Sequence, residues 1–214
     1  MTELLALPSA LGVALTPMAL VALVLLLRSR RAPGAVSGFL FGWTLGVVIV
    51  LAVVGFFAVV LPTDRDAAAS ARGILHLVAG ALLLLLALRA WWTRPRDADE
   101  PELPIWLRGA DDATFGLGFA LGFFQSALNP KNLLLLIAAG LAIAADPDRP
   151  IGPLLVLVGL FAVVASLALV VVSVIRAGRR ERLQVWLMTR GWVVTAAVSA
   201  IAGVVLVAPG LARV

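Results

Sequence analysis

The chain contains no cysteine, and charged residues make up only 14% of its 214 residues. Without cysteine there is no disulfide framework and no thiolate chemistry. A soluble domain has about 25% charged and about 45–50% apolar residues, whereas this chain is 62% hydrophobic. It has too few polar side chains to cover a surface in water. The composition therefore excludes a cytosolic enzyme, a secreted domain and a disordered protein, and it predicts a membrane protein.

Acidic residues are missing from the apolar stretches of the sequence. All 12 lie at the N-terminus or in the polar segments between those stretches, so no carboxylate is left for a proton relay or a cation site within the membrane. The sequence also has no nucleotide-binding P-loop, no Ser-His-Asp arrangement and no zinc-ligand spacing. We therefore expect no enzyme, no cofactor and no metal site. The net charge of +5 does not indicate nucleic-acid binding, because the basic residues are mainly arginines of the polar segments.

Six continuous apolar stretches are present, and a transmembrane helix needs about 20 such residues. They cover residues 4–27, 36–61, 73–92, 115–145, 151–175 and 191–209. The N-terminus has no basic residue ahead of its apolar run and no small-residue cleavage site after it. We therefore expect the first stretch to be a retained span rather than a signal peptide.

The arginines predict the orientation in the membrane. Eleven of them lie in the first, third and fifth polar segments and a twelfth, Arg89, just before the third, whereas four lie on the opposite side. Since positively charged loops stay in the cytoplasm, we expect both termini outside it. Residues 93–114 form a cytoplasmic linker between a three-helix unit at 1–92 and another at 115–214. Repeats with an odd number of spans must be inverted, as in many secondary transporters. The expected fold is an all-α bundle of six transmembrane helices in a 3+3 inverted repeat.

The fourth stretch is too long for one straight span. A helix over 115–145 would measure about 46 Å, against a hydrocarbon core of about 30 Å. Its centre holds Asn129-Pro130, and proline removes a backbone hydrogen bond and strains the preceding turn. The first stretch contains a second mid-span proline, in Thr16-Pro17. We therefore expect a broken or re-entrant helix to lead each half, which is typical of transporters that bind substrate between discontinuous helices.

Lys131 is the only lysine, and it lies near the midpoint of the fourth stretch. An ammonium at membrane depth costs about 2.5–3.5 kcal/mol on insertion scales, so it needs a partner or water. Candidate partners are carbonyls freed by Pro130 and the side chains of Gln125, Ser126, Asn129 and Asn132. Together with helix N-termini, such a site would favour an anion such as a carboxylate, phosphate or sulfate. The alternative is a structural lysine that is tied to carbonyls or reaches toward the membrane surface.

Two further features have both a functional and a structural interpretation. His76, the only histidine, lies near the outer end of the third stretch and could carry a proton or be an interfacial residue beside Arg72. Glycines recur every four residues, a spacing that lets helix backbones approach closely. The contact would be within one chain or at a sliding or homodimer interface. These glycines are Gly38, Gly42 and Gly46 in the second stretch and Gly118 and Gly122 in the fourth.

A family resemblance rests on the run GLGFALGFFQSALNPKNLLLL at residues 116–136. Agreement extends to Thr16-Pro17 with the arginines after it, to GFLFGW at 38–43, to Pro-Ile-Trp at 104–106 and to RLQVWL at 182–187. The sequence resembles the actinobacterial glycolipid-addressing family, whose members are called sulfolipid- or peptidoglycolipid-addressing proteins, within the lysine-exporter superfamily. The resemblance implies a six-helix inverted repeat that moves glycolipids, or assists their movement, to the cell surface. The Pro-Gly-Pro pattern of amino-acid exporters is absent, and Thr16-Pro17-Met18 stands in its place.

The leading hypothesis is an inner-membrane secondary transporter that exports an amphipathic, anionic glycolipid or a related metabolite. Pro17 and Pro130 would break the two helices, and Lys131 would bind the headgroup or exchange a proton. One alternative is an exporter of small amino acids. The other is a non-transporting adaptor for a lipid synthesis or export complex, with the glycine stripes as partner surfaces. The expected partners are membrane lipids and the substrate, with a second copy of the chain or lipid-export machinery in addition.

Overall fold

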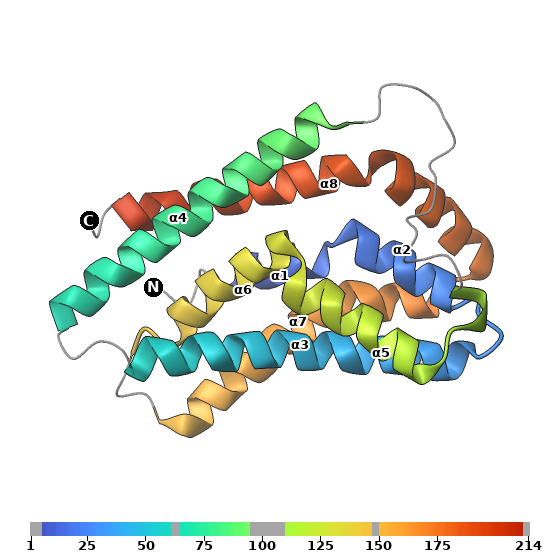
Figure 1. The fold of residues 1–214 in the computed structure, drawn as a ribbon, viewed down its shortest axis with the longest axis horizontal. Coiled ribbons are helices and arrows are strands. Elements are labelled where there is room, and N and C mark those ends of the chain that lie inside the picture. Colours follow the sequence, from blue (N-terminus) through green and yellow to red (C-terminus); the bar gives the residue numbers. More distant parts are fainter. Residues whose placement is uncertain (1–5, 61–64, 95–109, 147–149, 212–214) are drawn as a thin grey trace.

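The computed structural model describes residues 6–60, 65–94, 110–146 and 150–211 (Figure 1). Every regular element in these ranges is a helix. The α-helices are α1 (Ala6–Ala14), α2 (Pro17–Leu26), α3 (Ala32–Val60), α4 (Arg65–Trp92), α5 (Phe115–Phe123), α6 (Pro130–Ile143), α7 (Ile151–Val174) and α8 (Ala177–Leu211). A 3₁₀ turn, η3 (Ala110–Asp112), precedes α5, and a π-helical turn, η4 (Phe124–Leu128), follows it. The predictions made for the N-terminal five residues and for 95–109 of the linker lie outside the described residues.

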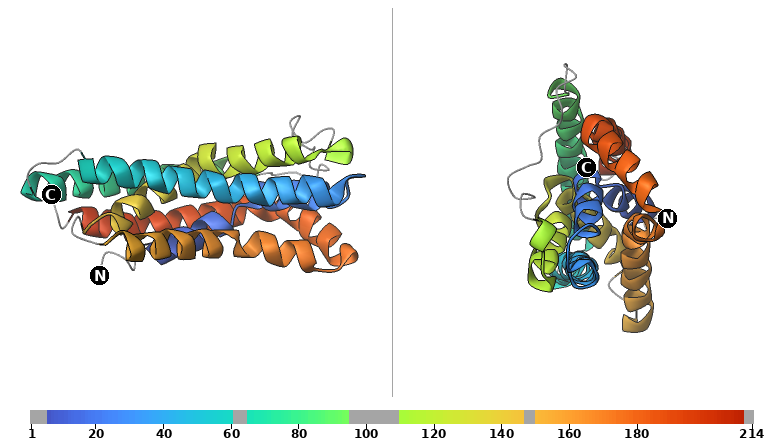
Figure 2. Two further views of the ribbon diagram at one scale, coloured as in Figure 1. Left: turned by 90° about the horizontal axis from the view of Figure 1, so that it is seen from below. Right: turned by 90° about the vertical axis from the view of Figure 1, so that its right-hand side faces the viewer.

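Four described helices are long and apolar enough to cross a membrane: Ala32–Ala58, Ser70–Trp92, Ile151–Val174 and Ala177–Ala208. Two bent pairs also qualify when each is taken together. α1 and α2 meet at 44°, and the segment of α5 and η4 meets α6 at 62°. The part of the chain that the structure describes therefore has four candidate spans, or up to six if each bent pair is one span, and the protein is a multi-pass membrane protein. The left view of Figure 2 shows most helices running along the long axis of the molecule, whereas Figure 1 shows α4 inclined to α3.

The breaks in the first and fourth stretches are confirmed, and the last helix is longer than predicted. α8 begins at Ala177, well before the expected start at residue 191. An apolar run does not reveal this extension, because residues 179–190 are rich in arginine. A proline occurs only near the end of α8, at Pro209, so nothing in its first half forces the helix to stop. The ribbon bends in this first part and then runs beside α4 (Figure 1).

The glycine stripes pack against each other within one chain. A Cβ on Gly38 or Gly42 would overlap the carbonyl of Phe115 or Phe119 in α5. Conversely, a Cβ on Gly118 or Gly122 would overlap the carbonyl of Ala35 or Phe39 in α3, and one on Gly46 would overlap the Ser126 hydroxyl. The contacts advance together along both helices, so α3 and α5 run parallel. The two glycine stripes therefore contact each other within one chain.

α4 and α8 form a second close pair, in which the helices run side by side (Figure 1). Gly80 and Gly203 make the approach possible, since a Cβ on either would lie 2.9 Å from the carbonyl oxygen of the other. Further along, the rings of Trp91 and Trp192 meet edge to face with centroids 5.6 Å apart. From the glycine contact to the tryptophan contact, the residue numbers rise along α4 and fall along α8, so the two helices are antiparallel.

The buried centre comes from the second halves of the two bent pairs. α2 buries eight of its ten residues and α6 ten of its fourteen, whereas α7 buries five of twenty-four. The side chains of α7 mostly face outward, which in a membrane means toward lipid. The helices that follow the two proline breaks therefore form the interior of the bundle.

Candidate functional site

The two bent pairs restart in the same way. Thr16 is the N-cap of α2 and Pro17 begins the helix, just as Asn129 is the N-cap of α6 and Pro130 begins that helix. Proline is tolerated in the first turn, because the N–H that it lacks has no helical partner there, and it disfavours helical backbone in the residue before it. Each dipeptide therefore ends one helix and starts the next, as the sequence predicted.

Lys131 joins the two breaks. Its ammonium donates to the carbonyl oxygen of Gly12, to that of Leu15 over 3.3 Å and to the hydroxyl of Thr16 over 3.1 Å. An ammonium has three hydrogens, so these three acceptors match its full capacity. The residue is only 4% exposed, and among the described residues no carboxylate forms an ion pair with it.

The acceptors explain how a positive charge is tolerated at this depth. Gly12 lies in the last turn of α1 and Leu15 follows its end, where carbonyls have no partner within the helix. The helix dipole is also negative at this end, which favours a nearby cation. Lys131 of α6 therefore caps the C-terminus of α1, and its position agrees with a lysine tied to carbonyls.

Thr16 and Asn132 complete a buried polar network. The Thr16 hydroxyl lies 2.7 Å from the Val13 carbonyl oxygen and 2.9 Å from Asn132 Oδ1, and its single proton can be donated to one of them at a time. The Asn132 amide donates to the Gln125 carbonyl oxygen over 2.9 Å. The carbonyls freed ahead of Pro130 are thus partly satisfied by Asn132, and the network spans α1, α6 and η4.

The remaining predicted residues lie around the break without contacting the ammonium. Asn129 accepts from the backbone N–H of Lys131 over 3.1 Å and donates to the Gln125 side-chain oxygen over 3.3 Å, so it fixes the local turn. Pro130 is exposed, and the buried hydroxyl of Ser126 donates to the Phe123 carbonyl and faces α3. The structure therefore brings together Lys131, Thr16 and Asn132, with Asn129 and Gln125 next to them.

His76 lies in another part of the bundle. Its side chain is 1% exposed, and its Nδ1 lies 2.7 Å from the Arg72 carbonyl oxygen. Arg72 also donates to the carbonyl of Ala145, beyond the end of α6, over 3.1 Å. Ala145 is about 20 Å of helix away from Lys131 at 1.5 Å per residue. His76 is therefore buried beside Arg72, far along the bundle from the two breaks.

Sequence reasoning missed the backbone half of this site. No side chain marks the backbone carbonyls of Gly12 and Leu15. Only the proline that follows, Pro17, indicates that α1 must end with free carbonyls nearby. The partnership across 119 residues between Lys131 and Gly12 requires the tertiary structure.

These features define a class of protein: a multi-pass helical membrane protein with two proline-broken helices that meet at a buried lysine. A family model described as Sap, sulfolipid-1-addressing protein, matches residues 6–212, and the chain belongs to this family. Membership indicates a role in glycolipid handling, and the resemblance to sulfolipid-addressing proteins is confirmed. Comparison with curated proteins and with solved structures gave no match.

Proposed function

We propose that this protein is a secondary transporter of a bacterial plasma membrane, without enzymatic activity, that exports a glycolipid or a related amphipathic, anionic metabolite. The observation that carries the proposal is the meeting of two broken helices at Lys131 and Thr16 in a sulfolipid-addressing family member. Broken helices that face each other near mid-membrane are the substrate site of many transporters, because their ends offer unpaired backbone groups.

The helix neighbours support an inverted repeat of two three-span halves. One half would be α1–α2, α3 and α4, and the other α5–α6, α7 and α8. In such a repeat α1, α2, α3 and α4 correspond to α5, α6, α7 and α8. The contact of α3 with α5 then corresponds to that of α7 with α1, and the contact of α2 with α8 corresponds to that of α6 with α4. All four contacts are present. The antiparallel pair of α4 and α8 maps onto itself, as an inverted repeat requires.

One pair of contacts departs from this symmetry in a way that alternating access would produce. α1 packs along α6, whereas the equivalent pair, α2 and α5, makes few contacts. Rocking of one repeat against the other exchanges such pairs, so that one side of the site closes as the other opens. In the orientation given by the arginines, the tightly packed pair closes the site toward the outside.

This movement of α1 would change the hydrogen-bond partners of Lys131. While α1 packs along α6, the carbonyls of Gly12 and Leu15 satisfy the ammonium. When α1 moves away, the three hydrogens lose these acceptors, and an anionic headgroup offers stronger, charge-assisted ones. We propose that the headgroup then replaces the α1 carbonyls, with Asn129, Asn132 and Gln125 orienting it.

Ligand-dependent thermal unfolding tests the proposal. We would compare wild type, Lys131→Met and Thr16→Val in detergent with an anionic glycolipid, a neutral lipid and small amino acids. A ligand at 100 times its Kd stabilises the folded state by about 2.7 kcal/mol, which corresponds to a rise in Tm of roughly 5–10 °C for a chain of this size. We expect this rise with the anionic glycolipid for wild type and Thr16→Val and none for Lys131→Met.

The matched variants separate a binding lysine from a structural one. Thr16→Val removes part of the hydrogen-bond network around Lys131 but keeps the charge of Lys131. If Lys131 had only a structural role, Thr16→Val and Lys131→Met would both change the Tm measured without lipid, and neither would change the response to lipid. Equal lipid responses in all three proteins would contradict the proposed site, as would glycolipid export at the wild-type rate by Lys131→Gln in proteoliposomes. Stabilisation by amino acids alone would favour the amino-acid exporter.

If the protein is an adaptor, its partner must bind to a surface other than the glycine stripes. Gly38 and Gly42 are covered by α5, so they offer no face to a partner unless α3 and α5 separate. An adaptor would show unchanged complementation of glycolipid export in cells with Lys131→Ala. Loss of export with a normally folded Lys131→Ala protein would rule it out.

A further inference from the structure

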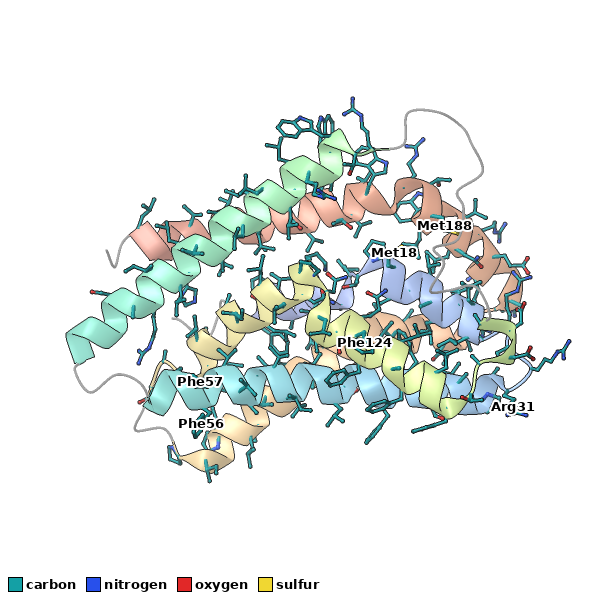
Figure 3. The ribbon with its side chains drawn as sticks, in the orientation of Figure 1. Met18, Arg31, Phe56, Phe57, Phe124 and Met188 are labelled. Atoms are coloured by element: carbon teal, nitrogen blue, oxygen red, sulfur yellow. The ribbon has the colours of Figure 1, made fainter. Side chains whose placement is uncertain are left out.

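A hollow of about 480 Å³ lies between the second half of α3, the end of α6 and the start of α7. Its walls are apolar, and Asp146 is the one charged residue among those that line it. Phe56, labelled in Figure 3, closes it where the end of α3 approaches the first turns of α7. Other wall residues are Val48, Leu51, Leu154, Leu155 and Val158.

The hollow extends from the level of the helix break to the end of the spans. Gly46 packs against Ser126, just before the break, and Val48 at the inner end of the hollow follows two residues later. From Val48 to Phe56, α3 rises about 12 Å at 1.5 Å per residue. At the other end lies Asp146, which follows α6. α3 and α7 are both apolar enough to be spans, and the wall residues Phe56, Ile151 and Leu155 are exposed, so the hollow opens on the side that would meet the hydrocarbon of the membrane.

Two glycines shape the hollow. A Cβ on Gly140 would lie 2.7 Å from the Val54 side chain, so glycine lets α6 approach α3 closely and form the floor. Gly55 lines the hollow from α3, and a Cβ there would meet nothing within 4 Å. The missing side chain at 55 therefore leaves part of the hollow empty, and a Cβ added there would displace no neighbour.

We propose that this hollow binds an acyl chain of the exported lipid once its anionic group has left Lys131, with the uncharged sugar hydroxyls of the headgroup at Asp146. The proposal rests on the proposed function for the identity of the lipid. The volume lies in the range of small-molecule sites, about 300–1,000 Å³. It equals about one turn of a helix that is about 10–12 Å wide and rises about 5.4 Å per turn, so it is too small for a partner helix of several turns. A carboxylate accepts hydrogen bonds from hydroxyls, so Asp146 suits a hydroxyl-rich sugar headgroup.

Photo-crosslinking with mapped positions tests the site. Purified protein in nanodiscs would receive either a glycolipid or phosphatidylcholine, each with a diazirine on its acyl chain, and crosslinked residues would be identified by mass spectrometry. We expect glycolipid crosslinks to concentrate on residues 48–56 and 154–158. Gly55→Leu should reduce them roughly tenfold, the loss expected when about two methylenes are displaced from an apolar site.

Gly159→Leu is the matched control. Gly159 lies in α7, a Cβ there also meets nothing within 4 Å, and it does not line the hollow. Both substitutions put leucine in a helix interior, so a shared effect on helix stability cancels in the comparison. We expect Gly159→Leu to keep wild-type crosslinking, and an excess of unlabelled glycolipid to suppress the crosslinks of wild type.

Three results would overturn the proposal: crosslinks spread evenly over the lipid-facing helices, unchanged crosslinking in Gly55→Leu, or equal labelling by phosphatidylcholine. The last result would identify ordinary boundary lipid. If Gly55→Leu does not fold, the proposal is tested by competition in wild type alone: crosslinking that an excess of unlabelled glycolipid does not suppress would overturn it. Crosslinking does not require transport, so failure here leaves the Lys131 experiment intact. A failed Lys131 experiment with positive crosslinking would instead refute the transport mechanism and keep the acyl-chain site.

Discussion

The ammonium of Lys131 donates to the hydroxyl of Thr16 over 3.1 Å, although 115 residues separate them in the sequence. Thr16 precedes the proline of one broken helix and Lys131 follows the proline of the other. The two breaks therefore belong to one site, held together by the hydrogen bonds of Lys131 and by the hydrogen bond from Thr16 to Asn132. Any movement of α1 against α6 must exchange these bonds for others.

Replacing Lys131 with methionine should destabilise the fold. The substitution keeps a similar length but leaves the Gly12 and Leu15 carbonyls without their charged donor, and hydrogen bonds to charged groups contribute about 1.5–3 kcal/mol each. We expect the Tm of Lys131→Met in detergent to fall by several degrees, since about 1 kcal/mol shifts the Tm by roughly 2–4 °C in a chain of this size. A Tm equal to that of wild type would show that the three hydrogen bonds contribute nothing to stability.

Thr16 and Asn132 should be energetically coupled. Thr16→Val keeps the side-chain shape but removes the hydroxyl that contacts both Lys131 and Asn132. In a double-mutant cycle with Asn132→Ala, residues of one hydrogen-bond network show a coupling of about 0.5–3 kcal/mol. We expect Thr16→Ser to retain most of the stability. Strictly additive losses, measured by denaturant titration, would show that the two residues act independently.

The interface of α3 and α5 should not tolerate a methyl group. A Cβ on Gly122 would overlap the Phe39 carbonyl, and backbone cannot rotate away as a side chain can. Overpacking of this kind costs about 1–3 kcal/mol, so we expect a lower Tm for Gly122→Ala. Gly159→Ala, where nothing lies within 4 Å, should be neutral or raise the Tm. Equal stability of the two variants would contradict the close approach.

The absence of cysteine makes the orientation directly measurable. Single cysteines placed at the exposed positions Ser70, Thr93, Pro150 and Gly178 can be labelled on intact cells with a membrane-impermeant maleimide. If the arginine-rich ends face the cytoplasm, we expect labelling of Ser70→Cys and Pro150→Cys. Thr93→Cys and Gly178→Cys should react only after the cells are opened. The reverse pattern would place both termini inside the cytoplasm.

Several features of the fold follow from local sequence. The apolar runs predict spans because lipid admits only backbones that satisfy their own hydrogen bonds. Thr16-Pro17 and Asn129-Pro130 predict breaks because proline cannot continue a preceding helix. The extension of α8 to Ala177 could not be predicted in this way, since a helix that carries arginines at a membrane surface leaves no apolar run.

The sequence by itself determined that this protein lives in a membrane, that its first and fourth helices are broken, and that one lysine lies at membrane depth. Only the tertiary structure decided that the two breaks meet, that Lys131 binds the end of α1 and that the two glycine stripes face each other. The physical reason is the kind of group involved. Breaks and spans depend on the conformational preference of neighbouring residues, whereas the partners of Lys131 are backbone carbonyls, which every residue carries and no side chain marks.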